Sequence, residues 1–263
     1  MTSSGGLLRV RRIGMAAPFR WLGGAWKDLW RAWPPLLAYG LALTAFSLGM
    51  TLSFVATGGA FWVFALTCGF VFVAPMLAMG LYEAGALLAR GERPTLARML
   101  FVPRALSADV AILGLALLMI FFFWLQIAQI VYGLSTWVIY RTVETLADFA
   151  LYTPEGHRML IVGSLIGGAL AFLTYGLVVV SAPMLLDRRT SVFAATITSF
   201  RAVAANFGPM ILWALLIAAL TLSTLLTGFL ALVIVFPWLG LATWRAYGDL
   251  VEAPDASTVG PAP

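Results

Sequence analysis

Four stretches of the chain contain no Asp, Glu, Lys, Arg or His, and they constrain its fold more than any other feature: residues 32–82, 110–140, 159–186 and 202–244. An α-helix needs about 20 apolar residues to cross a bilayer, because each residue advances the helix by about 1.5 Å. The first and last stretches are long enough for two spans each. The sequence therefore predicts an all-α polytopic membrane protein with six transmembrane helices in three hairpins, at about 36–56, 60–89, 110–132, 158–186, 210–226 and 229–247.

The composition agrees with a membrane protein. Apolar residues make up 62% of the chain and charged residues 10%, whereas roughly 25% of residues are charged in soluble domains. The single cysteine, Cys68, excludes a disulfide framework and is expected to be a small buried apolar residue. The net charge of +5 is spread over several short loops, so nucleic acid is not expected as a partner.

Each predicted hairpin follows a basic, aromatic segment typical of an amphipathic helix that lies in the membrane interface. These segments are 18–33, 95–106 and 191–206, and their cations include Lys27 and Arg201. The returning helix of each hairpin carries a late proline in a similar context, at which we expect a kink. These prolines are Pro75, Pro183 and Pro237. The matching positions predict a threefold internal repeat.

The connection between spans three and four differs from the other hairpin turns. Its apolar residues recur at helical spacing, which predicts a further interfacial helix at about 136–151 on the far side of the membrane. Ser107 is a candidate N-cap for span three, and Thr153 followed by Pro154 is typical of the start of span four.

The distribution of cations predicts the orientation. Placing both termini and the loops between hairpins on one side gathers every Lys and Arg there except Arg141 and Arg158. By the positive-inside rule, that side is the cytosol. We therefore expect a disordered cytosolic arm at 1–17, a membrane domain at 18–250 and a disordered cytosolic tail at 251–263.

Four polar residues are candidates for a function inside or near the membrane: Glu83, Gln126, Gln129 and Asp187. Glu83 follows the Pro75 kink, and it either lines a pathway or pairs with Arg90 or another cation of the interfacial segments. The two glutamines share one helix face and are expected to hydrogen-bond to another span. Asp187 is most simply the charged end of span four.

Catalytic chemistry has little support in the sequence. The only histidine is His157, and no cluster of His, Cys and carboxylates suggests a metal site. The chain also lacks GxSxG, HExxH and phosphate-loop motifs. We therefore expect neither a cofactor nor an enzymatic activity.

Five stretches carry a likeness to a known family: APMLAMGLYEAG from Ala74, LYTPEG from Leu151, VVSAPMLLDRR from Val179, ITSFRAVAANFGPMILWALL from Ile197 and WLGLATW from Trp238. In their order and spacing, they resemble the bacterial integral-membrane family named domain of unknown function 2189. The resemblance implies a six-span protein of the bacterial inner membrane whose activity is not established. In that family, the last span is similar to a GHATWHLY pattern. This chain has Leu241 and Arg245 at the positions of the two histidines.

Two functions stay open at this stage, with an enzyme acting on a lipid as a weaker third. In the first, the chain is a non-enzymatic scaffold or accessory subunit that binds another membrane complex as well as membrane lipids. In the second, three proline-kinked helices surround a cavity that opens to the cytosol, and Glu83 lines that cavity to bind or transport a lipid or small solute.

Overall fold

The computed structural model describes residues 8–252. The predicted all-α fold is confirmed for this part of the chain, and its only strand-like pairing is an isolated bridge between Val10 and Val251. The helices are α1 (Ala17–Arg31), α2 (Trp33–Ala56), α3 (Ala60–Leu77), α4 (Met79–Ala89), α5 (Leu96–Leu100), the 3-10 turn η1 (Pro103–Leu106), α6 (Ala108–Ser135), α7 (Val143–Tyr152), α8 (Pro154–Val178), α9 (Ser181–Asp187), α10 (Val192–Ala205), α11 (Phe207–Ser223), the 3-10 turn η2 (Thr224–Thr227) and α12 (Leu232–Leu250).

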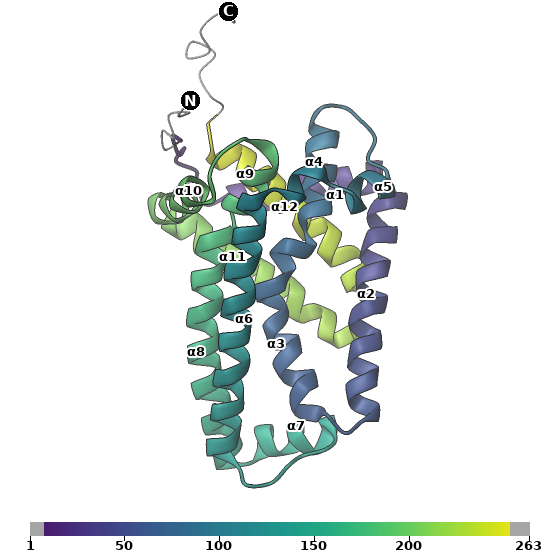
Figure 1. Cartoon of the computed structure of the whole chain (residues 1–263), viewed down its shortest axis with the longest axis vertical. Coiled ribbons are helices and arrows are strands. Elements are labelled where there is room, and N and C mark those ends of the chain that lie inside the picture. The colour runs from purple at the N-terminus through teal and green to yellow at the C-terminus, as the bar shows by residue number, and fades with distance from the viewer. Residues whose placement is uncertain (1–7, 253–263) are drawn as a thin grey trace, which may run out of the picture.

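The long helices α2, α3, α6 and α8 run along the long axis of the molecule (Figure 1). Helices α1, α4, α5, α9 and α10 gather at one end, where the described part of the chain also begins and ends, and we call this the termini end. Helix α7 lies at the opposite end, which we call the α7 end. The two kinds of helix that were predicted to be interfacial therefore lie at opposite ends of the bundle.

Within the described residues, five helical segments are long and apolar enough to cross a membrane: Trp33–Ala56, Ala60–Leu77, Ala108–Ser135, Pro154–Asp187 and Phe207–Thr227. The sixth predicted span corresponds to α12, which is not among them. Figure 1 shows α11 and α12 crossing the bundle diagonally, with the turn between them well short of the α7 end. Helices α2, α3, α6 and α8 thus extend to the α7 end, whereas the turn between α11 and α12 does not.

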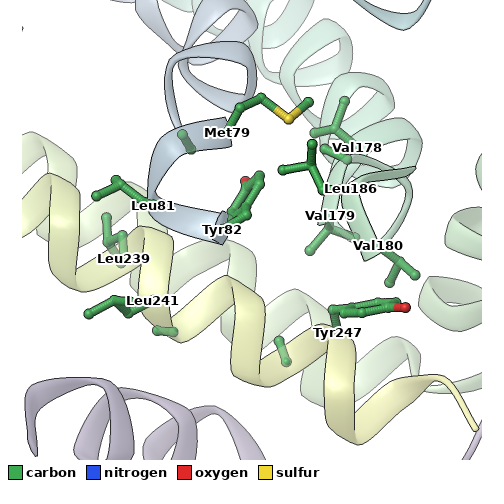
Figure 2. Close-up of a cluster of buried hydrophobic side chains, with 14 of the residues drawn as sticks. Met79, Leu81, Tyr82, Val178, Val179, Val180, Leu186, Leu239, Leu241 and Tyr247 are labelled. Atoms are coloured by element: carbon green, nitrogen blue, oxygen red, sulfur yellow. The ribbon is translucent and has the colours of Figure 1, made fainter. Parts of the chain in front are cut away.

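Helix α12 is the central helix of the termini end. It packs mainly against α1, α2 and α4, and it buries residues on most of its circumference, among them Phe236, Leu241 and Tyr247. Figure 2 shows α12 meeting side chains of α4 and of the α8–α9 junction in one apolar cluster. Hydropathy alone predicted a lipid-facing span here, whereas the helix is covered by other helices of the same chain.

The three late prolines have different effects. Pro75 lies near the end of α3, and the helix is interrupted three residues later, at Ala78. Pro183 lies in α9, and the interruption precedes it at residues 179–180, because proline has no N–H to donate to the carbonyl four residues earlier. Helix α12 continues through Pro237. The kinks predicted at equivalent positions are therefore two breaks on opposite sides of a proline and one continuous helix.

Side chains of neighbouring helices support both breaks. The Tyr39 hydroxyl of α2 donates to the Leu77 carbonyl at 2.7 Å. The Val180 N–H donates to the Ser199 hydroxyl of α10 at 3.2 Å. Each break exposes backbone polar groups, and each receives a partner from another segment, as a buried polar group requires.

The helix in the connection between α6 and α8 is shorter than expected. The residues at 136–142 form an irregular loop, and α7 begins only at Val143, where the Thr142 hydroxyl accepts from the Thr145 N–H. The predicted start at 136 was wrong because this cap competes successfully with a longer helix. The caps predicted at Ser107 and Thr153 are confirmed, since their hydroxyls accept from the N–H groups of Val110 and Gly156.

Part of the predicted loose arm is attached to the domain. The Arg11 N–H donates to the Leu250 carbonyl at 2.9 Å, and the Glu252 N–H donates to the Arg9 carbonyl at 3.2 Å. Residues 1–7 and 253–263, which include most of the predicted tail, lie outside the described residues. Cys68 is exposed on α3, so its expected burial was wrong.

Candidate functional site: a polar network at the termini end

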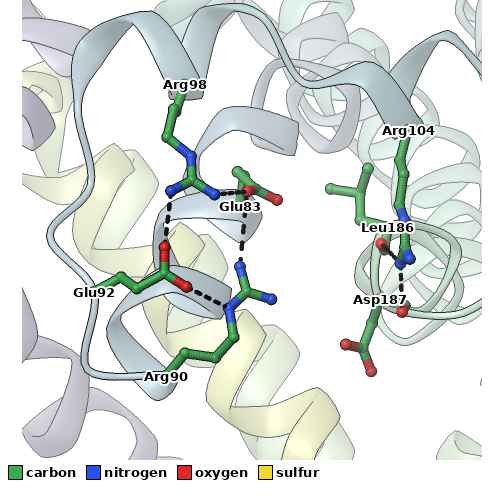
Figure 3. A network of polar contacts seen from close by, with 7 residues as sticks. All are labelled: Glu83, Arg90, Glu92, Arg98, Arg104, Leu186 and Asp187. Atoms are coloured by element: carbon green, nitrogen blue, oxygen red, sulfur yellow. Dashed lines mark hydrogen bonds and ion pairs between the residues drawn. The ribbon is translucent and has the colours of Figure 1, made fainter.

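Glu83 lies in an ion-pair network formed by α4, the α4–α5 loop and α5 (Figure 3). Its Oε1 atom lies 3.7 Å from Arg98 Nη2 and 4.0 Å from Arg90 Nη2. Glu92 joins the same two arginines, with its Oε2 atom 2.8 Å from Arg98 Nη1 and its Oε1 atom 3.1 Å from Arg90 Nε. The Glu83 side chain is 21% exposed. Glu83 could either line a pathway or pair with a cation, and in the structure it pairs with Arg98 and Arg90.

The loop carboxylate is the better-bound member of this network. The hydrogen bond from Arg98, followed by the hydrogen bond and charge of Arg90, lowers the pKa of Glu92 from its ordinary value. Both arginines are about half exposed, so solvent screens these interactions. The network fixes the conformation of the α4–α5 loop more than it adds to global stability.

Asp187 is the centre of a second group that joins α9, η1 and α12. The Tyr247 hydroxyl donates to Asp187 Oδ2 at 2.6 Å. Arg104 donates through Nη1 to the carbonyls of Leu186 and Asp187 at 2.6 and 2.5 Å (Figure 3). The Arg188 guanidinium lies 5.7 Å from the centre of the Tyr247 ring. Asp187 thus does more than end a helix, because it connects α9 to η1 and to α12.

Two further pairs join α1 to α12, which are more than 200 residues apart in the chain. The Arg245 Nη2 atom lies 2.6 Å from Asp28 Oδ2. The Trp21 Nε1–H donates to Asp249 Oδ2 at 2.7 Å. A hollow of about 280 Å³ lies beside the first pair, and Trp244 forms part of its wall. These contacts fasten the first interfacial helix to the last helix of the bundle.

Asn206 ties the N-terminal segment to the α10–α11 junction. Its Nδ2 atom donates to the Arg11 carbonyl at 2.9 Å, and its Oδ1 atom accepts from the Ile13 N–H at 2.8 Å. Asn206 is 4% exposed. Sequence reasoning missed this residue, although a solitary amide inside an apolar run was a usable signal.

The remaining candidates are exposed. Gln126 and Gln129 lie on open faces of α6, and in the described part of the chain neither makes a side-chain hydrogen bond, so the expected bonds to another span are not formed there. Lys27 and Arg201 also lie on exposed helix faces. The structure therefore brings Asp187 into contact with other parts of the chain, while it leaves these four side chains outside any network.

Among residues 8–252, no group of three or more His, Cys, Asp or Glu side chains is placed to hold a metal ion. The His157 ring nitrogen Nε2 lies 2.7 Å from the Leu151 carbonyl at the α7 end. At the termini end, carboxylates and arginines neutralise one another and hold helices together.

A comparison with known protein families finds a match in the middle of the chain. Residues 63–187 match the family model described as "Predicted integral membrane protein (DUF2189)". The match covers α3 to α9 and does not reach the stretches from Ile197 and Trp238 that also carried the resemblance. No curated protein and no solved structure matches the chain.

Proposed function

We propose that this chain, an integral membrane protein whose residues 63–187 are those of the DUF2189 family, is a non-enzymatic scaffold or accessory subunit of a membrane complex. The main support for the proposal is that the carboxylates at the termini end are paired within the chain. Glu83, Asp187 and Asp28 are each bound by groups of the same chain. A transport or catalytic carboxylate needs access to a ligand, whereas these carboxylates hold the interfacial helices in place.

The surface of α1 supports docking at the membrane interface. One face is buried against the bundle and includes Trp21 and Leu29. A second face presents Trp26 and Trp30 as exposed aromatics, and Lys27 lies beside them. Such a helix rests in the headgroup region, with aromatics at the apolar boundary and cations toward water.

Helix α10 offers the more prominent contact surface. Its buried side includes Ala195 and Ala202, whereas Phe193, Ile197 and Phe200 are exposed and Arg201 lies next to them. Phe193 is 73% exposed. Exposed aromatic and arginine side chains are enriched at protein interfaces, so this face is our candidate for the partner contact.

The finer topology belongs to the same proposal. All described cations other than Arg141 and Arg158 lie on the segments that the sequence assigns to the termini end, which we place in the cytosol of a bacterial cell, with the membrane domain in the inner membrane. Two full hairpins and a diagonal third one give six membrane-embedded helices. The order of interfacial helix, outgoing helix and returning helix, repeated along the chain, supports an internal threefold repeat.

The second candidate function, a cavity for a lipid or small solute opening to the cytosol, has less support. It requires a space lined by Glu83, and the hollow beside Asp28 and Arg245 does not include that residue. The centre of the termini end is instead filled by a continuous apolar core that contains α12.

Mass spectrometry of the protein extracted into native lipid discs without detergent tests the proposal. We expect a membrane protein at fixed stoichiometry with the chain, and we expect its loss in a double variant, Phe193→Ala with Arg201→Glu. A control variant, Trp137→Ala, should retain it, since Trp137 is 100% exposed and lies in the loop between α6 and α7, and α7 and α10 lie at opposite ends of the molecule. Recovery of the chain alone from such discs would contradict the scaffold function.

A further inference from the structure

A pocket at the α7 end has a lining that none of the features above explains. It has a volume of about 570 Å³ and is formed by the α2–α3 turn, the end of α6 and the 136–142 loop. Its walls are mainly aromatic, with Phe61 lying 5.4 Å from Trp62 and 5.1 Å from Tyr132 between ring centres. Pockets for small ligands commonly have volumes of about 300–1,000 Å³ and apolar walls.

The loop that closes the pocket is held in place. The Tyr132 hydroxyl donates to the Val138 carbonyl at 3.1 Å and accepts from the Tyr140 N–H at the same distance. The Tyr140 ring also stacks on Phe149 of α7, with 4.9 Å between ring centres. The wall is therefore a defined surface that links α6, the loop and α7.

Arg141 lies at the edge of this pocket and has no counter-charge. A Cβ atom added at Gly58, which lines the pocket, would lie 3.5 Å from Arg141 Cβ and 3.9 Å from Arg141 Cδ, so the base of the arginine side chain lies beside the pocket wall. Among the described residues, Arg141 makes no ion pair, whereas Arg158, at the same end, is held by Glu155 at 2.6 Å. Few cations lie at this end of the molecule, so an exposed arginine beside an aromatic pocket indicates an anionic ligand.

The pocket also lies where three candidate membrane spans, α2, α3 and α6, begin or end. Helix α2 ends at Ala56 and α3 begins at Ala60, so Phe54 and Trp62 lie in the apolar part of the spans while Arg141 lies beyond them. Aromatic residues of this kind gather where hydrocarbon meets headgroups. Gln129 lines the pocket with an amide that has no hydrogen-bond partner among the described side chains and backbone groups.

We propose that this pocket binds one phospholipid with an anionic headgroup. Its acyl chain lies against Phe54, Phe61 and Trp62, and its phosphate is bound by the Arg141 guanidinium, which matches the geometry of a phosphate oxygen pair. The Gln129 amide meets the ester region between them. This site lies at the opposite end of the molecule from the proposed partner surface and does not depend on it.

Native mass spectrometry with defined lipids tests the site. The purified full-length chain is supplied with phosphatidylglycerol and phosphatidylethanolamine of identical acyl chains, and retained lipid is counted at increasing activation energy. We expect one phosphatidylglycerol per chain to be retained in preference to phosphatidylethanolamine. Both lipids carry the phosphate, but phosphatidylethanolamine also carries an ammonium that repels the Arg141 guanidinium, so Arg141→Gln should lose about tenfold of that preference. Arg158→Gln should keep it.

A second variant separates the pocket from general surface attraction. Trp62→Leu should reduce retention of both lipids without changing the headgroup preference, because it alters only the apolar wall. Arg141 is exposed in a loop, so its variant is expected to keep the wild-type melting temperature. Equal losses in Arg141→Gln and Arg158→Gln, or no preference for phosphatidylglycerol in the wild type, would overturn the proposal.

Discussion

Replacing Gly40 by alanine tests the packing of α2 against α12, on which the structure of the termini end depends. A Cβ atom at Gly40 would meet the Val233 carbonyl oxygen at a separation too short for any real contact, and it would lie 2.9 Å from Pro237 Cγ. The Val233 carbonyl is the one that Pro237 cannot bond, because proline has no N–H. Gly40 therefore lets α2 approach α12 where the α12 backbone lacks a hydrogen bond.

The magnitude follows from what has to move. Both obstructing groups belong to the backbone or ring of α12, so α2 must shift away from a helix that is buried along most of its length. Overpacking of this kind costs about 1–3 kcal/mol. The better helix propensity of alanine returns up to about 1 kcal/mol. With the full propensity gain, we expect Gly40→Ala to lower the free energy of unfolding by up to about 2 kcal/mol.

Gly49 on the same helix is the matched control, since a Cβ there would meet nothing within 4 Å. Gly49→Ala should leave the free energy of unfolding unchanged or raise it slightly. Unfolding of both variants is followed by tryptophan fluorescence in mixed micelles with increasing denaturing detergent. If Gly40→Ala proved as stable as Gly49→Ala, the close contact of α2 with α12 would be refuted.

Three further changes probe the polar contacts. Glu83→Gln should cost less than about 1 kcal/mol in micelle unfolding, because its ion pairs at 3.7 and 4.0 Å involve half-exposed arginines; a much larger loss would mean that Glu83 holds the core. Asn206→Ala should cost about 2 kcal/mol, near 1 kcal/mol for each of its two bonds to the N-terminal segment, and hydrogen exchange at Ile13 should accelerate; unchanged exchange there would contradict the contact. Because the folded-state pKa of Glu92 is lowered, its contribution to holding the α4–α5 loop is present above the ordinary value of 4.5 and is lost as pH falls through the lowered pKa. Proteolysis of that loop by pepsin should therefore increase at acidic pH in the wild type, and Glu92→Gln should be susceptible already at pH 5; equal susceptibility of the two proteins at pH 5 would refute this.

The helices with the longest apolar runs were predictable because hydropathy reports directly on helices that face lipid. The N-caps at Ser107 and Thr153 were also predictable, since capping depends on residues within three positions of each other. The same reasoning was less accurate for α12. A helix buried by its own chain and a helix buried by lipid have the same composition, so hydropathy cannot distinguish them.

The network at the termini end was largely beyond prediction from one sequence. Asp28 and Arg245 are separated by 217 residues, and no local pattern relates them. The effect of each proline depended on partners elsewhere, as Tyr39 and Ser199 show at the two breaks. Glu83 was recognisable as unusual, but its ion pairs follow from how the loop at Gly91 and Glu92 folds back.

If the termini end is a platform for another membrane protein, with α10 at the contact, a crosslinker on α10 should capture that protein. Photo-crosslinking in intact cells compares a benzoylphenylalanine placed at Phe193 with one placed at Trp137, in the loop between α6 and α7. We expect a discrete protein adduct from position 193, absent from position 137, that disappears when Arg201 is replaced by Glu. Crosslinks to lipid alone from both positions would contradict it.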